Sequence, residues 1–282
     1  MKRILIPTDF SENAWNTILY AMQLYGDVSC EFYILNSFDV TPVQLISTVS
    51  SQRVGHYYEA VKMKSAQTLE MVMADIINSN PDEKHVFKSI SKPGTLIEAM
   101  EESINENHFD MIIIGTKGAT GAKEVFLGSN TQKVIRNIDA CPILVVPEDS
   151  FFDNITEIAF ATDFERMYYN SEIKPIVDLA KSHNATVRMI HVYDTPKLNQ
   201  IQRYNSNNLE HYFKSIPYDF HVIPDFSTIE RAIQAFIEEL EIDMLVMINY
   251  KHSFIERLTR EAVIKKITFH TAIPFLIIPS DT

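Results

Sequence analysis

The chain has 282 residues, a length that suits two domains of about 140 residues each. Its apolar content of 46% and charged content of 22% are those of an ordinary globular protein. The net charge of −12 disfavours nonspecific binding to nucleic acid or to an anionic membrane surface.

Other features of the sequence argue against a membrane protein, a secreted protein and a metalloprotein. No apolar run reaches the ~18 residues of a membrane span, and the N-terminus lacks the apolar stretch of a signal peptide. The two cysteines form no CxxC motif and the nine histidines show no ligand spacing. We therefore expect a cytoplasmic protein without a metal site.

Strands and helices alternate along the first half of the chain. Short apolar runs predict five strands, at Ile4–Pro7, Phe32–Leu35, Val86–Ile90, Met111–Ile114 and Ile143–Val146. Patterns with helical periodicity lie between them, at about 11–26, 54–78, 95–107 and 129–138.

The second half repeats this order of elements. Strands are predicted at Ile158–Ala161, Val187–His191, Phe220–Ile223, Met244–Ile248 and Phe275–Ile278, with helices between them. Strands that alternate with helices form parallel βαβ units. The sequence thus predicts the α/β class, with two tandem Rossmann-like domains, each a five-stranded parallel sheet with helices on both faces.

Matching landmarks recur in the same order in both halves and indicate an internal duplication. They are Pro7-Thr-Asp-Phe10 with Ala161-Thr-Asp-Phe164, the capping boxes Thr95-x-x-Glu98 and Ser227-x-x-Glu230, Asp110-Met111 with Asp243-Met244, and Cys141–Pro147 with Ile273–Pro279. We place the domains at residues 1–148 and 154–282. The offset between copies falls from 155 at Asp39 to 132 at Thr95, so the first copy holds extra residues within roughly 40–62, as a surface excursion or a flap beside a pocket.

All seven glycines lie in the first 128 residues, and four of them fall between Gly115 and Gly128. This segment follows a predicted buried strand and precedes a predicted helix. A flexible loop that leads into a helix N-terminus can bind phosphate through its backbone N–H groups. Glycine allows a ligand to approach the backbone closely.

The spacing Gly115-x2-Gly118-x9-Gly128-Ser129 resembles the signature of the universal stress protein family. The opening segment, ILIPTDFSENA, is similar to that of the family's ATP-binding members, and the resemblance extends over both halves. It implies a tandem universal stress protein with the adenine nucleotide α-hydrolase-like fold. It also implies ATP as the ligand of the first copy, with or without Mg²⁺.

The resemblance assigns roles to residues that follow three predicted strands. Asp9 would contact the ribose or adenine, next to Thr8, and Pro7 would line the base, while the backbone at Ser37 would face the adenine. Phosphates would lie against Gly115, Gly118 and Gly128, with Ser129 and Asn130 bonding them. The first copy departs from the family at Asn36-Ser37, where His-Val is common, and the second copy keeps that pair as His191-Val192.

Structural roles are the alternatives for several of these residues. Ser129 and Gln132 have the spacing of a capping box, and Asp9 could cap the first helix together with Ser11. Lys117 and Lys123 would either screen phosphate charge or simply be solvated.

The second copy has no glycine in the matching loop, Asn249 to Glu261, and Glu261 stands where the first copy has Ser129. A carboxylate there would repel phosphate, so we expect one nucleotide site per chain. We expect the last strands of the two copies to pair with each other and form a pseudo-dimer within one chain. The sequence does not decide whether two chains also form a homodimer.

The leading functional hypothesis is a stress-response protein that binds ATP as a regulatory ligand. No GxxxxGKS or GxxxxGKT motif and no carboxylate cluster for phosphoryl transfer is present, so we assign no catalytic residue, although slow hydrolysis stays open. The alternatives are a scaffold that binds no nucleotide and an ATP-consuming enzyme related to ATP pyrophosphatases.

Overall fold

The computed structural model describes residues 1–39, 51–79, 84–116, 128–148, 150–193, 198–224, 229–250 and 273–281. The chain divides into two compact units, Met1–Cys141 and Pro142–Thr282. This division falls shortly before the end of the first sequence repeat, and the sequence-based limits of 148 and 154 stay a prediction. Within the described ranges, no helix is both long and apolar enough to cross a membrane.

The first unit contains four parallel strands that lie in the order β3-β2-β1-β4. Their bounds are β1 Lys2–Pro7, β2 Cys30–Phe38, β3 Val86–Pro93 and β4 Met111–Gly115. The three inner residues of β1, Ile4 to Ile6, are fully buried, as are Ile112 and Ile113 of β4. These strands are apolar without alternation because helices cover both faces of a parallel sheet.

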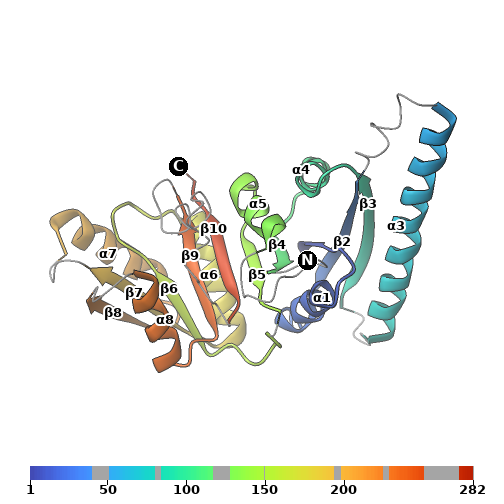
Figure 1. Cartoon of the computed structure of the whole chain (residues 1–282). Helices are drawn as coiled ribbons and strands as arrows, with labels where there is room; N and C mark the ends of the chain where they lie inside the picture. The colour runs from blue at the N-terminus through green and yellow to red at the C-terminus, as the bar shows by residue number, and fades with distance from the viewer. Residues whose placement is uncertain are drawn as a thin grey trace. The chain divides into compact units, whose positions relative to one another are not determined.

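Within the described residues, the first unit has four helices, of which three connect its strands and the fourth, α5, follows β4. They are α1 Glu12–Leu24, α3 Ser51–Ser79, α4 Leu96–Glu106 and α5 Ser129–Asn137. Right-handed crossovers in this strand order place α1 and α3 on one face of the sheet and α4 and α5 on the other. Figure 1 shows this separation.

Side-chain caps fix where two of these helices begin. Ser11 is the N-cap of α1, and its hydroxyl accepts a hydrogen bond from Ala14 N at 3.2 Å. Thr95 and Glu98 form the predicted capping box of α4, in which each side chain bonds the other residue's backbone N–H. The hydrogen bond from Thr95 N, with one from the Thr95 hydroxyl, lowers the pKa of the Glu98 carboxyl.

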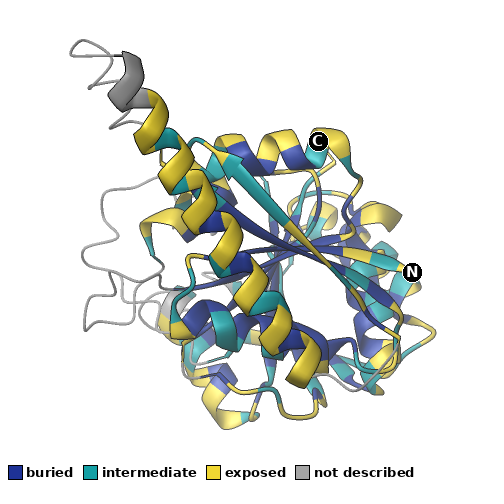
Figure 2. Ribbon diagram, turned by 90° about the vertical axis from the view of Figure 1, so that its right-hand side faces the viewer, coloured by how far each residue is buried: buried dark blue, intermediate teal, exposed yellow. Residues whose placement is uncertain are grey.

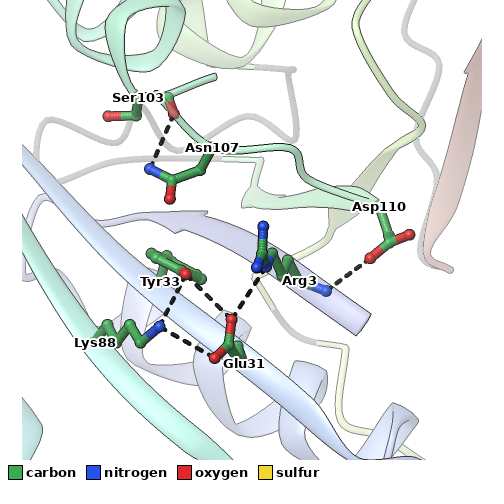
Figure 3. Close-up of polar contacts among 7 residues, drawn as sticks. All are labelled: Arg3, Glu31, Tyr33, Lys88, Ser103, Asn107 and Asp110. Atoms are coloured by element: carbon green, nitrogen blue, oxygen red, sulfur yellow. Dashed lines mark hydrogen bonds and ion pairs between the residues drawn. The ribbon is translucent and has the colours of Figure 1, made fainter. Parts of the chain in front are cut away.

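An ion network joins the three strands β1, β2 and β3 across one face of the sheet (Figure 3). Glu31 accepts from Arg3 Nε at 3.2 Å and from Lys88 Nζ at 3.1 Å, and Lys88 also lies over the ring of Tyr33. The hydrogen bond from Lys88 holds the pKa of Glu31 below its usual range.

Asp110 and its counterpart Asp243 explain one of the repeated landmarks. Asp110 Oδ2 accepts from Arg3 N at 2.8 Å, and Asp243 Oδ2 accepts from Glu157 N at 2.9 Å. In each copy the carboxylate therefore ties the start of the fourth strand to the first strand. Figure 3 shows the contact in the first copy.

The second unit has six strands in the order β5-β10-β9-β6-β7-β8. Their bounds are β5 Ile143–Val146, β6 Glu157–Ala161, β7 Thr186–Tyr193, β8 Tyr218–Pro224, β9 Met244–Asn249 and β10 Phe275–Pro279. Among the described residues of this unit, the helices are α6 Asn170–His183, α7 Gln200–Phe213 and α8 Ile229–Glu239. The described strands match the predicted ones to within a few residues, and the α/β fold with tandem domains is confirmed.

The last strands of the two sequence copies pair with each other. Strands β5 and β10 are antiparallel, with Leu144 opposite Leu276 and Val145 opposite Phe275. All other strand pairs whose register the described residues define are parallel. The predicted pairing of the two last strands, which is the basis of an intrachain pseudo-dimer, is confirmed.

Part of the extra sequence in the first copy lengthens a helix. Residues 51–62 are the first turns of α3, which has 29 residues, whereas the matching helix of the second copy, α7, has 14. The remaining extra residues, 40–50, lie outside the described part of the chain. The extra residues from Ser51 onward are thus helical.

Candidate functional site

The carboxyl ends of β1 and β4 lie side by side in the first unit, because these strands are parallel neighbours. The chain leaves β1 toward β2 on one side and later returns to β4 on the other side. This is the switch point of the sheet, where ligands bind in open α/β folds. The residues that the sequence assigned to the site lie at the ends of β1, β2 and β4 or in the segments that follow β1 and β4.

Pro7 ends β1, and the tight turn that follows carries two more of the predicted residues, Thr8 and Asp9. Pro7 and Thr8 are buried and Asp9 is exposed. The Thr8 hydroxyl accepts from Phe10 N at 3.0 Å, and Asp9 Oδ1 accepts from Ser11 N at 3.1 Å. Phe10 has a φ of 66°, so the two side-chain hydrogen bonds hold a left-handed residue in place.

Asp9 does not cap α1 itself, since Ser11 is the N-cap. One oxygen of Asp9 orders the turn just before the helix, as described above. The carboxylate is exposed just after the carboxyl end of β1, beside the switch point, where a ligand's hydroxyl group could reach it. The structural role and the binding role are compatible at this residue.

Asn36 near the end of β2 supports the same turn from the side. Its amide nitrogen donates to the carbonyl oxygen of Thr8 at 2.8 Å, and its oxygen accepts from the Ser65 hydroxyl at 2.7 Å. The Ser65 hydroxyl also lies 2.7 Å from that of Ser91. This buried polar chain links β1, β2, β3 and α3.

Ser37 lies within β2, which ends at Phe38, three residues beyond the predicted end at Leu35. Leu35 O accepts from Thr8 N at 2.8 Å, and Phe38 O accepts from Gly94 N on the opposite side of the strand. Backbone groups alternate between the two sides of a strand. The N–H and C=O of Ser37 therefore face the side of β1, just beyond the last paired residue of β1.

Gly115 ends β4 and lies against α1. A Cβ atom added there would come within 2.6 Å of Asn13 Nδ2 and 2.9 Å of Thr17 Oγ1. Real Cβ atoms do not approach other atoms so closely. The glycine is thus required for helix–sheet packing, a reason that the loop argument from sequence did not include.

The end of β4 and the start of α5 are joined by hydrogen bonds. Gly128 N donates to the carbonyl oxygen of Thr116, and the Thr131 hydroxyl donates to the carbonyl oxygen of Gly115 at 2.8 Å. The first turn of α5 is therefore fixed against the end of β4. The Thr116 side chain is buried, and its hydroxyl has no hydrogen-bond partner within the described residues.

Gly128 is the N-cap of α5, and no side chain caps this helix. Ser129 is the first helical residue, so the capping box of Ser129 with Gln132 does not form. Ser129 and Asn130 are exposed, and backbone N–H groups in a first helical turn have no partner within the helix. The structure thus leaves a helix N-terminus, with its partial positive charge, at the switch point.

The backbone at Gly128, with φ −56° and ψ 153°, is one that any residue can adopt. The backbone conformation therefore does not require a glycine at this position. The explanation that agrees with the backbone angles is that a side chain here would block the close approach of a ligand. Gly118, Lys117 and Lys123 lie outside the described residues.

The second copy repeats the turn after its first strand but fills the surrounding space with side chains. Phe164 has a φ of 58°, and the Thr162 hydroxyl accepts from its N–H at 3.3 Å. His191 Nδ1 lies 3.0 Å from the carbonyl oxygen of Thr162, where the first copy uses Asn36. The change from histidine to asparagine keeps this contact.

The side chain of Tyr250 contacts Asp163, which is partly exposed and is the counterpart of Asp9. The Tyr250 hydroxyl donates to Asp163 Oδ2, and the Arg166 guanidinium lies 5.0 Å from the Tyr250 ring centroid and 5.3 Å from that of Tyr168. Burial, together with the Asp163 charge, raises the pKa of Tyr250. Of the second loop, Asn249 and Tyr250 are described, and Glu261 is not.

Comparison with known proteins agrees with the fold. The model of the universal stress protein family matches residues 1–147. The chain belongs to the universal stress protein family. Universal stress protein Slr1230 of Synechocystis sp. is 26% identical over 98% of this chain and 99% of its own length. Universal stress protein MJ0577 of Methanocaldococcus jannaschii is 28% identical over 51% of this chain and 94% of its own length.

A solved structure of a universal stress protein from Archaeoglobus fulgidus superposes with a TM-score of 0.70. Its identity is 16%, and the match covers 98% of this chain and 96% of the other. Together with the full-length match to Slr1230, this likeness shows that the whole chain is a tandem universal stress protein.

Sequence reasoning gave no role to three residues beside the first-copy site: Asn36, Thr116 and Thr131. The alignment of the two copies placed Asn36 opposite His191, but it did not predict that either side chain holds the turn after the first strand. Thr116 and Thr131 carry no signal in a single sequence.

Proposed function

We propose that this universal stress protein binds ATP in its first copy, as a regulatory ligand of a stress response. The observation that carries the proposal is the start of α5, which has no capping side chain and is fixed at the switch point beside β4. A helix N-terminus in this position favours phosphate through N–H groups and the helix dipole.

The phosphate end of the ligand would lie against Gly128, Ser129 and Asn130. The glycine allows close approach, and the Ser129 hydroxyl adds a donor. Gly118 belongs to the proposal through the spacing of the sequence motif alone. The buried Thr116 hydroxyl supports it, since a polar group without a partner is costly unless a ligand or a water satisfies it.

The adenosine end would lie across the ends of β1 and β2. Pro7 and Thr8 would line this part of the site, and the Ser37 backbone faces it with a donor and an acceptor. Asp9 at the rim offers its carboxylate to ribose hydroxyls. The proposal covers the nucleotide with or without Mg²⁺.

The ligand role, rather than fast turnover, follows from the groups near the proposed phosphates. The described residues there are Gly128, Ser129, Asn130 and Thr116, which supply hydrogen bonds but no general base. Phosphoryl-transfer enzymes bring metal-binding carboxylates and a residue that positions water. We therefore propose that the protein senses the concentration of the nucleotide by binding it, without fast hydrolysis.

A thermal-shift experiment with Gly128→Val tests this proposal. ATP at ~100 times its dissociation constant adds about 2.7 kcal/mol to the free energy of unfolding, which raises the Tm by several degrees. Valine can adopt the backbone angles of Gly128, so the variant should fold and lose the shift because its side chain blocks the ligand. Gly55→Ala, in the exposed N-terminal part of α3, is the control and should keep the shift.

Two results would count against the proposal. A full ATP-induced shift in Gly128→Val would place the nucleotide elsewhere. No shift in the unmodified protein with ATP, ADP or AMP would favour the scaffold that binds no nucleotide.

A further inference from the structure

A polar residue, Ser65, lies on the buried face of helix α3. Ser65 is 4% exposed and shares this face with Leu69 and Ile76, which are 2% and 0% exposed. Figure 2 shows much of the opposite side of α3 in yellow, as exposed. A buried hydroxyl group needs a hydrogen-bond partner and has a single hydrogen to donate. The partner that receives this hydrogen therefore indicates what Ser65 does.

Ser65 donates its hydrogen to the sheet and not to its own helix. A serine inside a helix can donate to a carbonyl oxygen one turn earlier, and Ser103 of α4 does so, with Ala99 O at 2.7 Å. Ser65 donates instead to the side-chain oxygen of Asn36 on β2, also at 2.7 Å. The hydroxyl of Ser65 thus joins α3 to the sheet.

The hydrogen bonds around Ser65 form a chain with one possible direction. The carbonyl oxygen of Thr8 can only accept, so Asn36 presents its amide nitrogen there and its oxygen to Ser65. Ser65 then has no hydrogen left for the Ser91 hydroxyl at 2.7 Å, so Ser91 must donate to Ser65. Asn36 and Ser91 are direct partners in the register of β2 and β3. The chain therefore runs from β3 through α3 and β2 to the turn after β1.

The chain ends at the first peptide of this turn. Leu35 O accepts from Thr8 N at 2.8 Å and Asn36 donates to Thr8 O, so β2 holds both backbone groups of Thr8. Because a peptide unit is planar, a fixed Thr8 carbonyl group also fixes the direction of the Asp9 N–H. Asp9 carries the carboxylate that we propose for the ribose. The chain thus sets the orientation of the turn that would hold the adenosine end of the nucleotide.

The helix after the second strand also contacts this turn in the second copy, with different residues. Gln202 of α7 donates to Asp163 O at 3.1 Å, and Asn205 of α7 donates to Phe164 O at 2.8 Å. These two bonds hold the matching turn directly. Support of the turn by this helix is therefore common to both copies, and in the first copy it passes through Asn36.

From these contacts we infer that Ser65 is a positioning residue for the nucleotide, and that it acts through Asn36 on the turn at the adenosine end. The inference rests on the proposed nucleotide site and adds α3 to the elements that set its affinity. The phosphate end, at the start of α5, is held by other bonds, from Gly128 N and the Thr131 hydroxyl. A change at Ser65 therefore affects the adenosine end and not the phosphate end.

Calorimetric titration of the full-length protein with ATP and with tripolyphosphate tests this inference, because tripolyphosphate has no adenosine. Ser65→Ala should weaken ATP binding about fivefold, the effect of one lost hydrogen bond, and leave the affinity for tripolyphosphate unchanged. Ser91→Ala should weaken ATP binding less, since the bond from Ser65 to Asn36 stays. Ser103→Ala is the matched control, because it also removes a buried helical hydroxyl group and should change neither affinity.

A double variant shows whether Ser65 acts through Asn36. Asn36→Ala already interrupts the chain, so the addition of Ser65→Ala should weaken ATP binding no further. Unchanged ATP affinity in Ser65→Ala, an equal loss for ATP and tripolyphosphate, or a further loss in the double variant would overturn the positioning role while the proposed function stands. No ATP binding by the unmodified protein would overturn the proposed function, and this inference with it.

Discussion

The side-chain amide of Asn36 donates a hydrogen bond to the carbonyl oxygen of Thr8 over an N–O distance of 2.8 Å. His191 makes the equivalent contact with Thr162 in the second copy, at 3.0 Å. The two residues differ in chemistry but hold the same turn after the first strand. The turn, rather than the identity of the donor, is the feature that both copies share.

Asn36→Leu should destabilise the protein by about 2 kcal/mol or more, because it leaves the Thr8 carbonyl and the buried Ser65 hydroxyl without this partner. Urea denaturation measures the change. Asn36→His, which introduces the residue that the second copy uses, is the matched variant and should recover part of the loss. A change below about 0.5 kcal/mol in Asn36→Leu would show that the contact does not support the turn.

Gly115→Ala should cost about 1–3 kcal/mol, because the new methyl group would meet Asn13 and Thr17 on the buried face of α1. Gly55→Ala serves as the control, since a Cβ at that helical position meets nothing within 4 Å. This control should be neutral or stabilising by about 0.5–1 kcal/mol. Equal effects of the two substitutions would refute the packing role of Gly115.

Tyr250→Phe should lower the free energy of unfolding by about 1–2 kcal/mol, because Asp163 loses a hydroxyl donor. The same variant should gain no second ATP site, since the phenylalanine ring still lies beside Asp163. Chemical denaturation and ATP titration measure the two outcomes. Nucleotide binding that appears in the second copy of this variant would show that the hydroxyl alone had closed the site.

Alkaline pH should reduce the stabilising effect of the Tyr250 hydroxyl. Burial and the Asp163 charge raise the pKa of Tyr250 in the folded state above the unfolded value of about 10. The contribution is therefore fully present below pH ~10 and is lost as the pH rises toward the folded pKa. The stability difference between the unmodified protein and Tyr250→Phe should therefore narrow above pH ~10, and urea denaturation at several pH values measures it.

The alternation of strands and helices could be predicted because each element carries its own local signal. The run Met111–Ile114 is apolar without interruption, and β4 is buried at every residue. Thr95 and Glu98 have the spacing of a capping box, and the box forms. The pairing of β5 with β10 followed from two short apolar runs bracketed by prolines.

Side-chain contacts between residues far apart in the sequence could not be predicted, because no local pattern marks them. The bond from Asn36 to Thr8 spans 28 residues, and that from Tyr250 to Asp163 spans 87. The steric reason for Gly115 depends on how closely α1 approaches β4, a distance that one sequence does not encode. Prediction from sequence thus reached the strands that carry the site but not the contacts that shape it.

Calorimetric titration of the full-length protein with ATP tests the central claim most directly. The open helix N-terminus of α5 and the contact of Tyr250 with Asp163 predict one ATP per chain, with the heat of binding lost in Gly128→Val. A stoichiometry of two ATP per chain, or one ATP still bound by Gly128→Val, would contradict the assignment of the nucleotide to the first copy alone.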